Sequence, residues 1–90
     1  MTDRDRKPAQ VPGVLVISEK EGARLEHPET GTVRHLNSSA LAIWSLCDGE
    51  TTIAEMAEAI SEVTGLGLDE AIGEVTAVIS RLKLAGMIDG

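Results

Sequence analysis

Two histidines have the type and spacing that could hold a metal ion. His27 and His35 would face each other if the segments around them form a hairpin, so that both imidazoles could approach one cation. A protein zinc site uses at least three nitrogen, sulfur or oxygen ligands. Neither a cysteine nor an organised carboxylate accompanies this pair. We therefore interpret both histidines as surface residues of strands, and we predict no metal and no cofactor.

A second candidate for chemistry is Cys47, the one cysteine of the chain. A single cysteine excludes an intramolecular disulfide and a cysteine-based zinc site. Cys47 falls on the apolar face of an expected helix, and the neighbouring Asp48 and Glu50 oppose formation of a thiolate. The sequence therefore predicts a buried, unreactive thiol in a protein of the reducing cytoplasm.

Other catalytic arrangements lack their sequence signatures. Serine, histidine and aspartate are all present, but no nucleophile elbow and no glycine-rich phosphate loop accompanies them. We predict that the protein is not an enzyme and has no catalytic residues.

Charge and hydropathy restrict the class of partner. The formal net charge of -7 at pH 7 would repel the phosphates of a nucleic acid. No apolar run approaches the ~20 residues that a membrane-spanning helix needs. We therefore expect neither nucleic acid nor membrane as a partner. A neutral or weakly basic peptide, or a basic patch of another protein, fits this surface better.

The first part of the chain predicts a small sheet. Residues 1–12 are mostly polar or charged and contain no hydrophobic segment, and we expect a disordered lead-in there. Three short segments after it have the apolar content or the alternation of strands: Val14–Ile17, Ala23–His27 and Thr32–Leu36. Turn residues separate these segments, so we predict an antiparallel meander that needs further elements to be stable.

Three helices follow this sheet. Asn37 and the two serines after it offer oxygens to the free N–H groups at the start of the first helix. Thr52 and Glu55 have the spacing of a capping box for the second helix, and a third begins near Asp69. We therefore predict an α+β fold, in which a three-stranded antiparallel N-terminal sheet is followed by a three-helix, winged-helix-like bundle. It forms one domain over residues 13–90.

One face of the third helix carries small side chains. Gly73, Ala77, Ser80 and Leu84 fall together on this face, away from the apolar one, and three of the four are small. A glycine inside a helix costs about 1 kcal/mol relative to alanine, and no capping role explains this one. The small face could admit another backbone, pack against the second helix, or be a tolerant surface.

The order and spacing of several short motifs resemble the PqqD family. The motifs are Leu36-Asn37 followed by small residues, Ile43-Trp44, Leu46-Cys47-Asp48-Gly49, Thr52-Ile53-Ala54-Glu55-Met56, and Leu82 with Gly86-Met87-Ile88. The resemblance covers most of the expected domain. It implies a RiPP recognition element, where RiPP denotes a ribosomally synthesised and post-translationally modified peptide. Such a protein is a peptide chaperone that holds the leader segment of a precursor peptide and catalyses nothing itself.

The resemblance also implies where the leader would bind. In that family the leader adds as a strand beside the third strand, and its side chains enter a cleft against the third helix. In this chain the peptide-binding edge would be Thr32, Val33, Arg34, His35 and Leu36, and the helix wall would be Val75, Ala77, Val78, Arg81 and Leu82. A free strand edge has unpaired N–H and C=O groups, which an incoming chain can bind.

Some of these residues have an alternative interpretation. Val75 and Leu82 could be wholly core residues. Arg34 and Arg81 are candidates for binding acidic side chains of the leader, but each could instead be a solvated surface arginine. The sequence leaves these alternatives open.

The partners implied by the resemblance belong to natural product biosynthesis. They are the precursor leader peptide and a modifying enzyme, such as a radical SAM enzyme or a leader peptidase. Two other functions stay open. A winged-helix DNA-binding regulator would need base-contacting side chains on its recognition helix, for which the third helix offers only Arg81 and Lys83. A self-associating scaffold would form a stable oligomer without any peptide.

Overall fold

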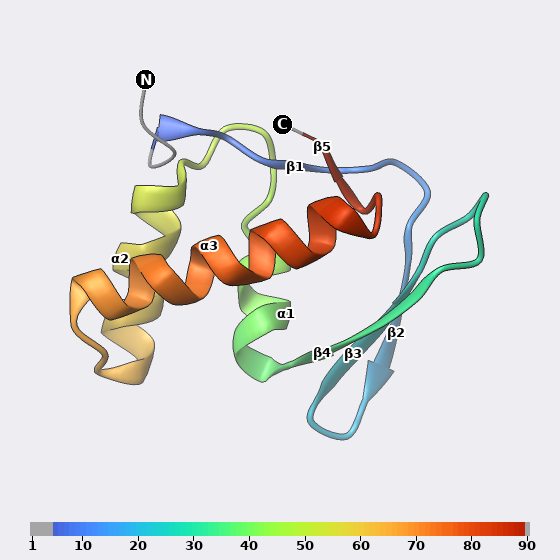
Figure 1. The fold of residues 1–90 in the computed structure, drawn as a ribbon. Coiled ribbons are helices and arrows are strands. Elements are labelled where there is room, and N and C mark those ends of the chain that lie inside the picture. Colours follow the sequence, from blue (N-terminus) through green and yellow to red (C-terminus); the bar gives the residue numbers. More distant parts are fainter. Residues whose placement is uncertain (1–4, 90) are drawn as a thin grey trace.

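A three-stranded sheet lies at one side of a bundle of three helices in the computed structural model, which describes residues 5–89 (Figure 1). The sheet contains, in chain order, the antiparallel strands β2 (Leu15–Glu19), β3 (Gly22–Glu26) and β4 (Val33–Asn37). The helices that follow are α1 (Ser38–Ser45), α2 (Ile53–Thr64) and α3 (Leu68–Leu84). This order confirms the predicted α+β fold.

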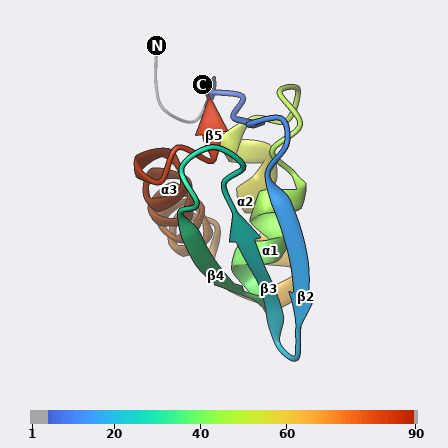
Figure 2. The same cartoon turned by 90° about the vertical axis from the view of Figure 1, so that its right-hand side faces the viewer.

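The sheet has one face towards the helices and one face towards solvent. Ala23 and Leu25 of β3 and Leu36 of β4 are buried, because alternate residues of paired strands point to the same side. Figure 2 shows the helices behind the sheet, with α3 on the side of β4. Strand β4 is therefore the edge strand that lies next to α3.

The core joins the sheet to all three helices. It is almost wholly aliphatic, and its fully buried side chains include Leu25, Ile43, Ile53, Met56, Val75, Leu82 and Met87. Trp44, the one aromatic residue of the chain, is 3% exposed. Burying a large apolar side chain contributes about 1.5–3 kcal/mol, so this shared core holds the helices against the sheet.

Local sequence sets the starts of the helices. The Asn37 side chain caps α1, and Thr52 and Glu55 form the expected capping box of α2. Helix α3 begins one residue before Asp69, whose negative charge lies favourably in the first turn. None of the helices within the described part of the chain is long and apolar enough to span a bilayer.

The segment before β2 differs from the disordered lead-in expected over residues 1–12. Residues 1–4 lie outside the described residues. Pro8 is buried, and β1 (Ala9–Gln10) pairs antiparallel with β5 (Ile88–Asp89) in a second, two-stranded sheet. The expectation of disorder is therefore wrong for this pairing segment.

Main-chain hydrogen bonds explain why this polar segment is held in place. The Gln10 N–H donates to the Cys47 carbonyl at 3.0 Å, and the Val11 N–H donates to the Met87 carbonyl at 3.0 Å. Backbone pairing does not require an apolar side-chain pattern, so the composition of the segment carried no sign of it. We call residues 8–11 the N-terminal strap.

Candidate functional site

Strand β4 has one open side. It pairs with β3, and no other strand in residues 5–89 pairs with it. The His27 N–H donates to the Thr32 carbonyl at 2.9 Å, which marks a hydrogen-bonded pair at the start of the ladder. Bonded and non-bonded pairs alternate along an antiparallel ladder. The register therefore turns the backbone N–H and C=O groups of Val33 and His35 towards the open edge.

A side chain covers one of these outward backbone groups. The Arg34 Nη1 donates a hydrogen bond to the Val33 carbonyl at 2.8 Å. This bond agrees with the alternation, because a carbonyl bonded into the β3–β4 ladder would point away from the open edge. A flexible charged side chain is also a common means of protecting an edge strand from unwanted pairing.

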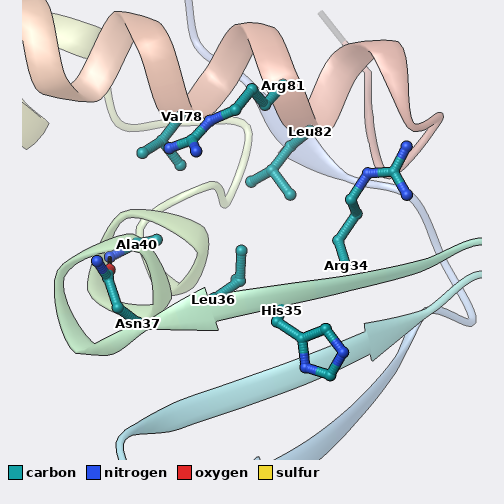
Figure 3. A pocket seen from close by; sticks show the side chains of 8 residues that line it. All are labelled: Arg34, His35, Leu36, Asn37, Ala40, Val78, Arg81 and Leu82. Atoms are coloured by element: carbon teal, nitrogen blue, oxygen red, sulfur yellow. Dashed lines mark hydrogen bonds between the residues drawn. The ribbon is translucent and has the colours of Figure 1, made fainter.

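A pocket of about 110 Å³ lies beside this edge, between β4, the start of α1 and α3 (Figure 3). Its lining consists of Arg34, His35, Leu36, Asn37, Ala40, Val78, Arg81 and Leu82. Figure 3 shows Arg34 and Leu36 directed from β4 towards α3, whereas the His35 imidazole points to the other side of the sheet. Small-molecule pockets have volumes of about 300 Å³ or more, so this one has the size of a subsite for a single side chain.

The pocket is apolar in its depth and positively charged at its margin. Leu36, Val78 and Leu82 are all more than nine-tenths buried and form its inner surface. Arg34 and Arg81 are exposed and approach it from β4 and from α3. An apolar side chain that enters the pocket would therefore be flanked by guanidinium groups.

Neither arginine of the pocket has an acidic partner among the residues that the structure describes. Within residues 5–89, Arg34 and Arg81 form no ion pair, and no aspartate or glutamate lines the pocket. Arg24, by contrast, pairs with Glu19 and Glu26. The pocket is thus a positively charged site in a chain whose net charge is -7.

The structure places most of the expected peptide-binding residues around this pocket. The remaining four differ in position: Thr32 immediately precedes β4, and Val33 lies on its open edge. Val75 is fully buried and belongs to the core, which was the alternative interpretation. Ala77 is exposed and does not line the pocket. The binding role of the pocket residues stays a prediction.

Two residues that line the pocket were not among the peptide-binding residues expected from the sequence. Asn37 and Ala40 border the pocket, and the Asn37 Oδ1 accepts a hydrogen bond from the Ala40 N–H at 2.8 Å. The capping pattern itself was the available signal. A helix that begins directly after an edge strand must place its first turn at the end of that edge.

The two histidines do not lie opposite each other in the β3–β4 ladder. His27 pairs with Thr32, and His35 lies opposite Arg24, so the expectation that the imidazoles could face each other is wrong. The His35 Nδ1 instead lies 3.0 Å from the Glu19 Oε1. The described part of the chain contains no group of three or more potential ligands that could hold a metal ion.

Cys47 is buried, as predicted. Its Sγ donates to the Ile43 carbonyl at 3.3 Å. Burial raises the pKa of Cys47 to about 12, and the negative charge of Asp48 adds to this effect. The thiol is therefore neutral at physiological pH and inaccessible to substrates.

The small face of α3 is separate from the pocket. Gly73, Ala77 and Ser80 are exposed, and a Cβ atom added to Gly73 would meet nothing within 4 Å. This face therefore does not pack against α2, which was one of the expected alternatives. A shallow depression farther along α3 is lined by Ser80, Lys83 and Leu84.

Two solved structures share this fold. A chain described as "TbiB1 in Complex with the TbiA(beta) Leader Peptide" superimposes with a TM-score of 0.80 and 20% sequence identity, over 91% of this chain and 95% of that chain. The "Lasso peptide synthetase B1 complexed with the leader peptide" has a TM-score of 0.77 and 24% identity, over 93% of this chain and 99% of that chain. No curated protein matches the chain.

A family match covers the segment that contains the edge strand and the pocket. Residues 23–88 match the sequence profile of the family described as Coenzyme PQQ synthesis protein D (PqqD). The matched segment begins in β3 and ends in β5, so it includes β4 and all three helices. The chain belongs to the PqqD family.

Proposed function

We propose that this protein binds the leader segment of a ribosomally synthesised precursor peptide as an added strand on β4 and presents it to a modifying enzyme. The outward backbone groups of Val33 and His35, beside a pocket of side-chain size, carry the proposal. Pairing of main chains supplies affinity with little demand on sequence, and pockets for alternate side chains supply selectivity.

The similar solved structures support this proposal. Both contain a chain of the same fold that is described as a complex with a leader peptide. The family description refers to the synthesis of a coenzyme. A protein that holds a peptide while another protein modifies it is compatible with the solved structures and with the family description.

The proposed action requires binding and no catalysis by this chain. The chemistry would belong to a partner enzyme that acts on the presented precursor, such as a radical SAM enzyme or a leader peptidase. The neutral, buried Cys47 suits the reducing cytoplasm, where we expect the protein to work.

Backbone pairing alone would bind a flexible peptide weakly. Each hydrogen bond contributes about 0.5–1.5 kcal/mol net, and ordering a disordered peptide offsets much of that gain. Contacts in the pocket between β4 and α3 must therefore add to the affinity. This predicts that leader binding depends both on the edge of β4 and on the pocket.

A proline substitution tests the role of the edge. Val33→Pro removes an outward N–H group, but it leaves the β3–β4 ladder bonds in place because Val33 and Glu26 form a non-bonded pair. We expect leader binding to weaken about tenfold or more through loss of a main-chain bond and steric hindrance by the ring. Isothermal titration calorimetry with a synthetic peptide of the cognate leader sequence measures the effect.

The other edge of the sheet supplies a matched control. The register turns the backbone groups of Val16 towards the open edge of β2, so Val16→Pro makes the same change where no leader is proposed to bind. Glu58→Ala, on the exposed side of α2, is a second control. Both variants should bind the leader like the parent, and circular dichroism should show that all variants are folded. Equal weakening by Val16→Pro and Val33→Pro would contradict the proposal.

A further inference from the structure

The geometry of β4 determines which side chains of an added strand would meet α3. Arg34 and Leu36 point towards α3, and residues opposite each other in paired strands share a face. The residues of the added strand opposite Arg34 and Leu36 would therefore both enter the space below α3. These two residues are two positions apart in the sequence of the added peptide, which we call the guest. This spacing holds whether the guest runs parallel or antiparallel to β4.

The position opposite Leu36 favours an apolar side chain. The buried surfaces of Leu36, Val78 and Leu82 surround the pocket there, and Ala40 adds a small side chain. The cavity of about 110 Å³ has room for one side chain. A charged group that reached the depth of the pocket would lose its hydration among these buried apolar side chains, whereas Arg34 and Arg81 lie at the exposed margin.

The position opposite Arg34 favours a carboxylate. The Arg34 guanidinium has no acidic partner in residues 5–89, and its observed bond is to the Val33 carbonyl. That carbonyl is also the acceptor that a guest N–H group would need. A guest carboxylate beside Arg34 would give the guanidinium a stronger, charge-assisted bond and so release the carbonyl for pairing.

We propose that this site selects extended peptides in which an aspartate or glutamate stands two residues from an apolar side chain, and that Arg34 moves from the Val33 carbonyl to this carboxylate on binding. Arg81, on the opposite wall of the pocket, adds to the positive field there. This inference rests on the proposed function and adds to it the chemical class of the ligand.

Because of the net charge of the protein, the preference for an acidic residue should be confined to the guest position opposite Arg34. A chain of charge -7 repels an acidic peptide at long range. Carboxylates at other positions of the guest would therefore lower the association rate, and they would have no local basic partner to offset this effect. Selection should enrich an acidic residue at one position relative to the apolar residue, and should not enrich acidic residues along the whole peptide.

Selection from a displayed library of random decapeptides tests the inference on the full chain. The expected result is a common pattern of an apolar residue with aspartate or glutamate two positions away. Synthetic peptides from this set should bind about tenfold more tightly than their asparagine or glutamine counterparts, as expected for a charge-assisted hydrogen bond. In NMR titrations, the bound acidic peptides should change the Val33 and His35 amide signals.

Charge reversal distinguishes a change of preference from a folding defect, because a misfolded variant would lose binding and would not select the opposite charge. The double variant Arg34→Glu with Arg81→Glu should select lysine or arginine at the position where the parent selects an acidic residue. Lys7→Glu with Lys20→Glu makes the same change in net charge at exposed residues outside the pocket, and it should keep the preference of the parent.

The remaining outcomes separate this inference from the proposed function. If peptides bind at the β4 edge without an acidic residue at that spacing, or if both double variants select alike, the inference is overturned and the proposed function stands. If no peptide is enriched, or if bound peptides leave the Val33 and His35 amides unchanged, both are overturned.

Discussion

Asp48 organises the connection between α1 and α2 although it is exposed. Its Oδ1 accepts hydrogen bonds from the Glu50 N–H at 2.9 Å and the Thr51 N–H at 2.8 Å, and its Oδ2 accepts one from the Thr51 hydroxyl at 3.0 Å. These bonds, led by the one from Glu50, lower the pKa of Asp48. The capping box of α2 follows directly, so this one side chain helps to set the direction of that helix.

The lowered pKa makes the contribution of Asp48 dependent on pH. The unfolded chain binds a proton on Asp48 at higher pH than the folded chain does. The stabilisation is therefore present above the unfolded value of about 3.9 and is lost as the pH falls through the folded value. Asp48→Ala should lower the urea midpoint at neutral pH, and the gap to the parent should narrow on acidification.

Urea unfolding followed through the emission of Trp44 measures this effect from about pH 7 to about pH 2.5. Asp48→Asn keeps an oxygen acceptor without the charge, and its midpoint at neutral pH should lie between those of the parent and Asp48→Ala. Glu58→Gln removes a negative charge from an exposed position of α2 and controls for net charge at neutral pH. A gap that stays constant over the whole pH range would contradict the prediction.

Two glycines show how differently the same residue type acts in a strand and in a helix. Gly22 begins β3 with a φ of +154°, and an added Cβ atom would collide with the Leu36 carbonyl of β4. The absence of a side chain thus permits the close approach of the two strands. Gly73 lies within α3, where an added Cβ atom would meet nothing within 4 Å.

Alanine substitutions at these two positions should change stability in opposite directions. Gly22→Ala should lower the free energy of unfolding by about 2 kcal/mol or more, which is the cost of inserting atoms into a packed site. Gly73→Ala should raise it by about 1 kcal/mol, because alanine favours the helix and no clash offsets the gain. Denaturant unfolding of both variants tests this. Destabilisation by Gly73→Ala would contradict the prediction that an added methyl group has free space at this position.

The N-terminal strap links parts of the molecule that are far apart in the chain. The Gly49 N–H donates to the Pro8 carbonyl at 3.0 Å, and the Gln10 side chain donates to the Trp44 carbonyl at 2.9 Å. On its other side, β1 pairs with β5. The strap precedes the segment that matches the PqqD family, and it ties the α1–α2 connection to the end of the chain.

Removal of residues 1–10 should therefore destabilise the whole domain. We expect the free energy of unfolding to fall by about 2–3 kcal/mol, because several main-chain hydrogen bonds are lost. Urea unfolding monitored by Trp44 emission measures the loss. Gln10→Ala removes only the side-chain bond to Trp44 and should cost less. Leader binding at β4 should persist in the folded fraction of the truncated protein, and an unchanged midpoint would contradict the structural role of the strap.

The elements themselves could be predicted because their signals are local. The side chains of Asn37 and Thr52 cap helices through hydrogen bonds to residues only three positions away. The alternation of apolar and polar residues in β3 shows which face of the strand is buried. Interactions of such short range leave a pattern within a few residues, so the fold class, the starts of α1 and α2 and much of the core could be predicted from the sequence alone.

The strap and the pocket required the tertiary structure because their partners are distant in the chain. Gln10 meets Trp44 at a separation of 34 residues, through a main-chain acceptor that any residue could offer. The pocket brings β4 against α3, and the register with β3 turns Val33 outward and directs Arg34 towards α3. Backbone groups are the same at every position, so which of them stay unpaired depends on how the chain packs and leaves no trace in the identity of the residues.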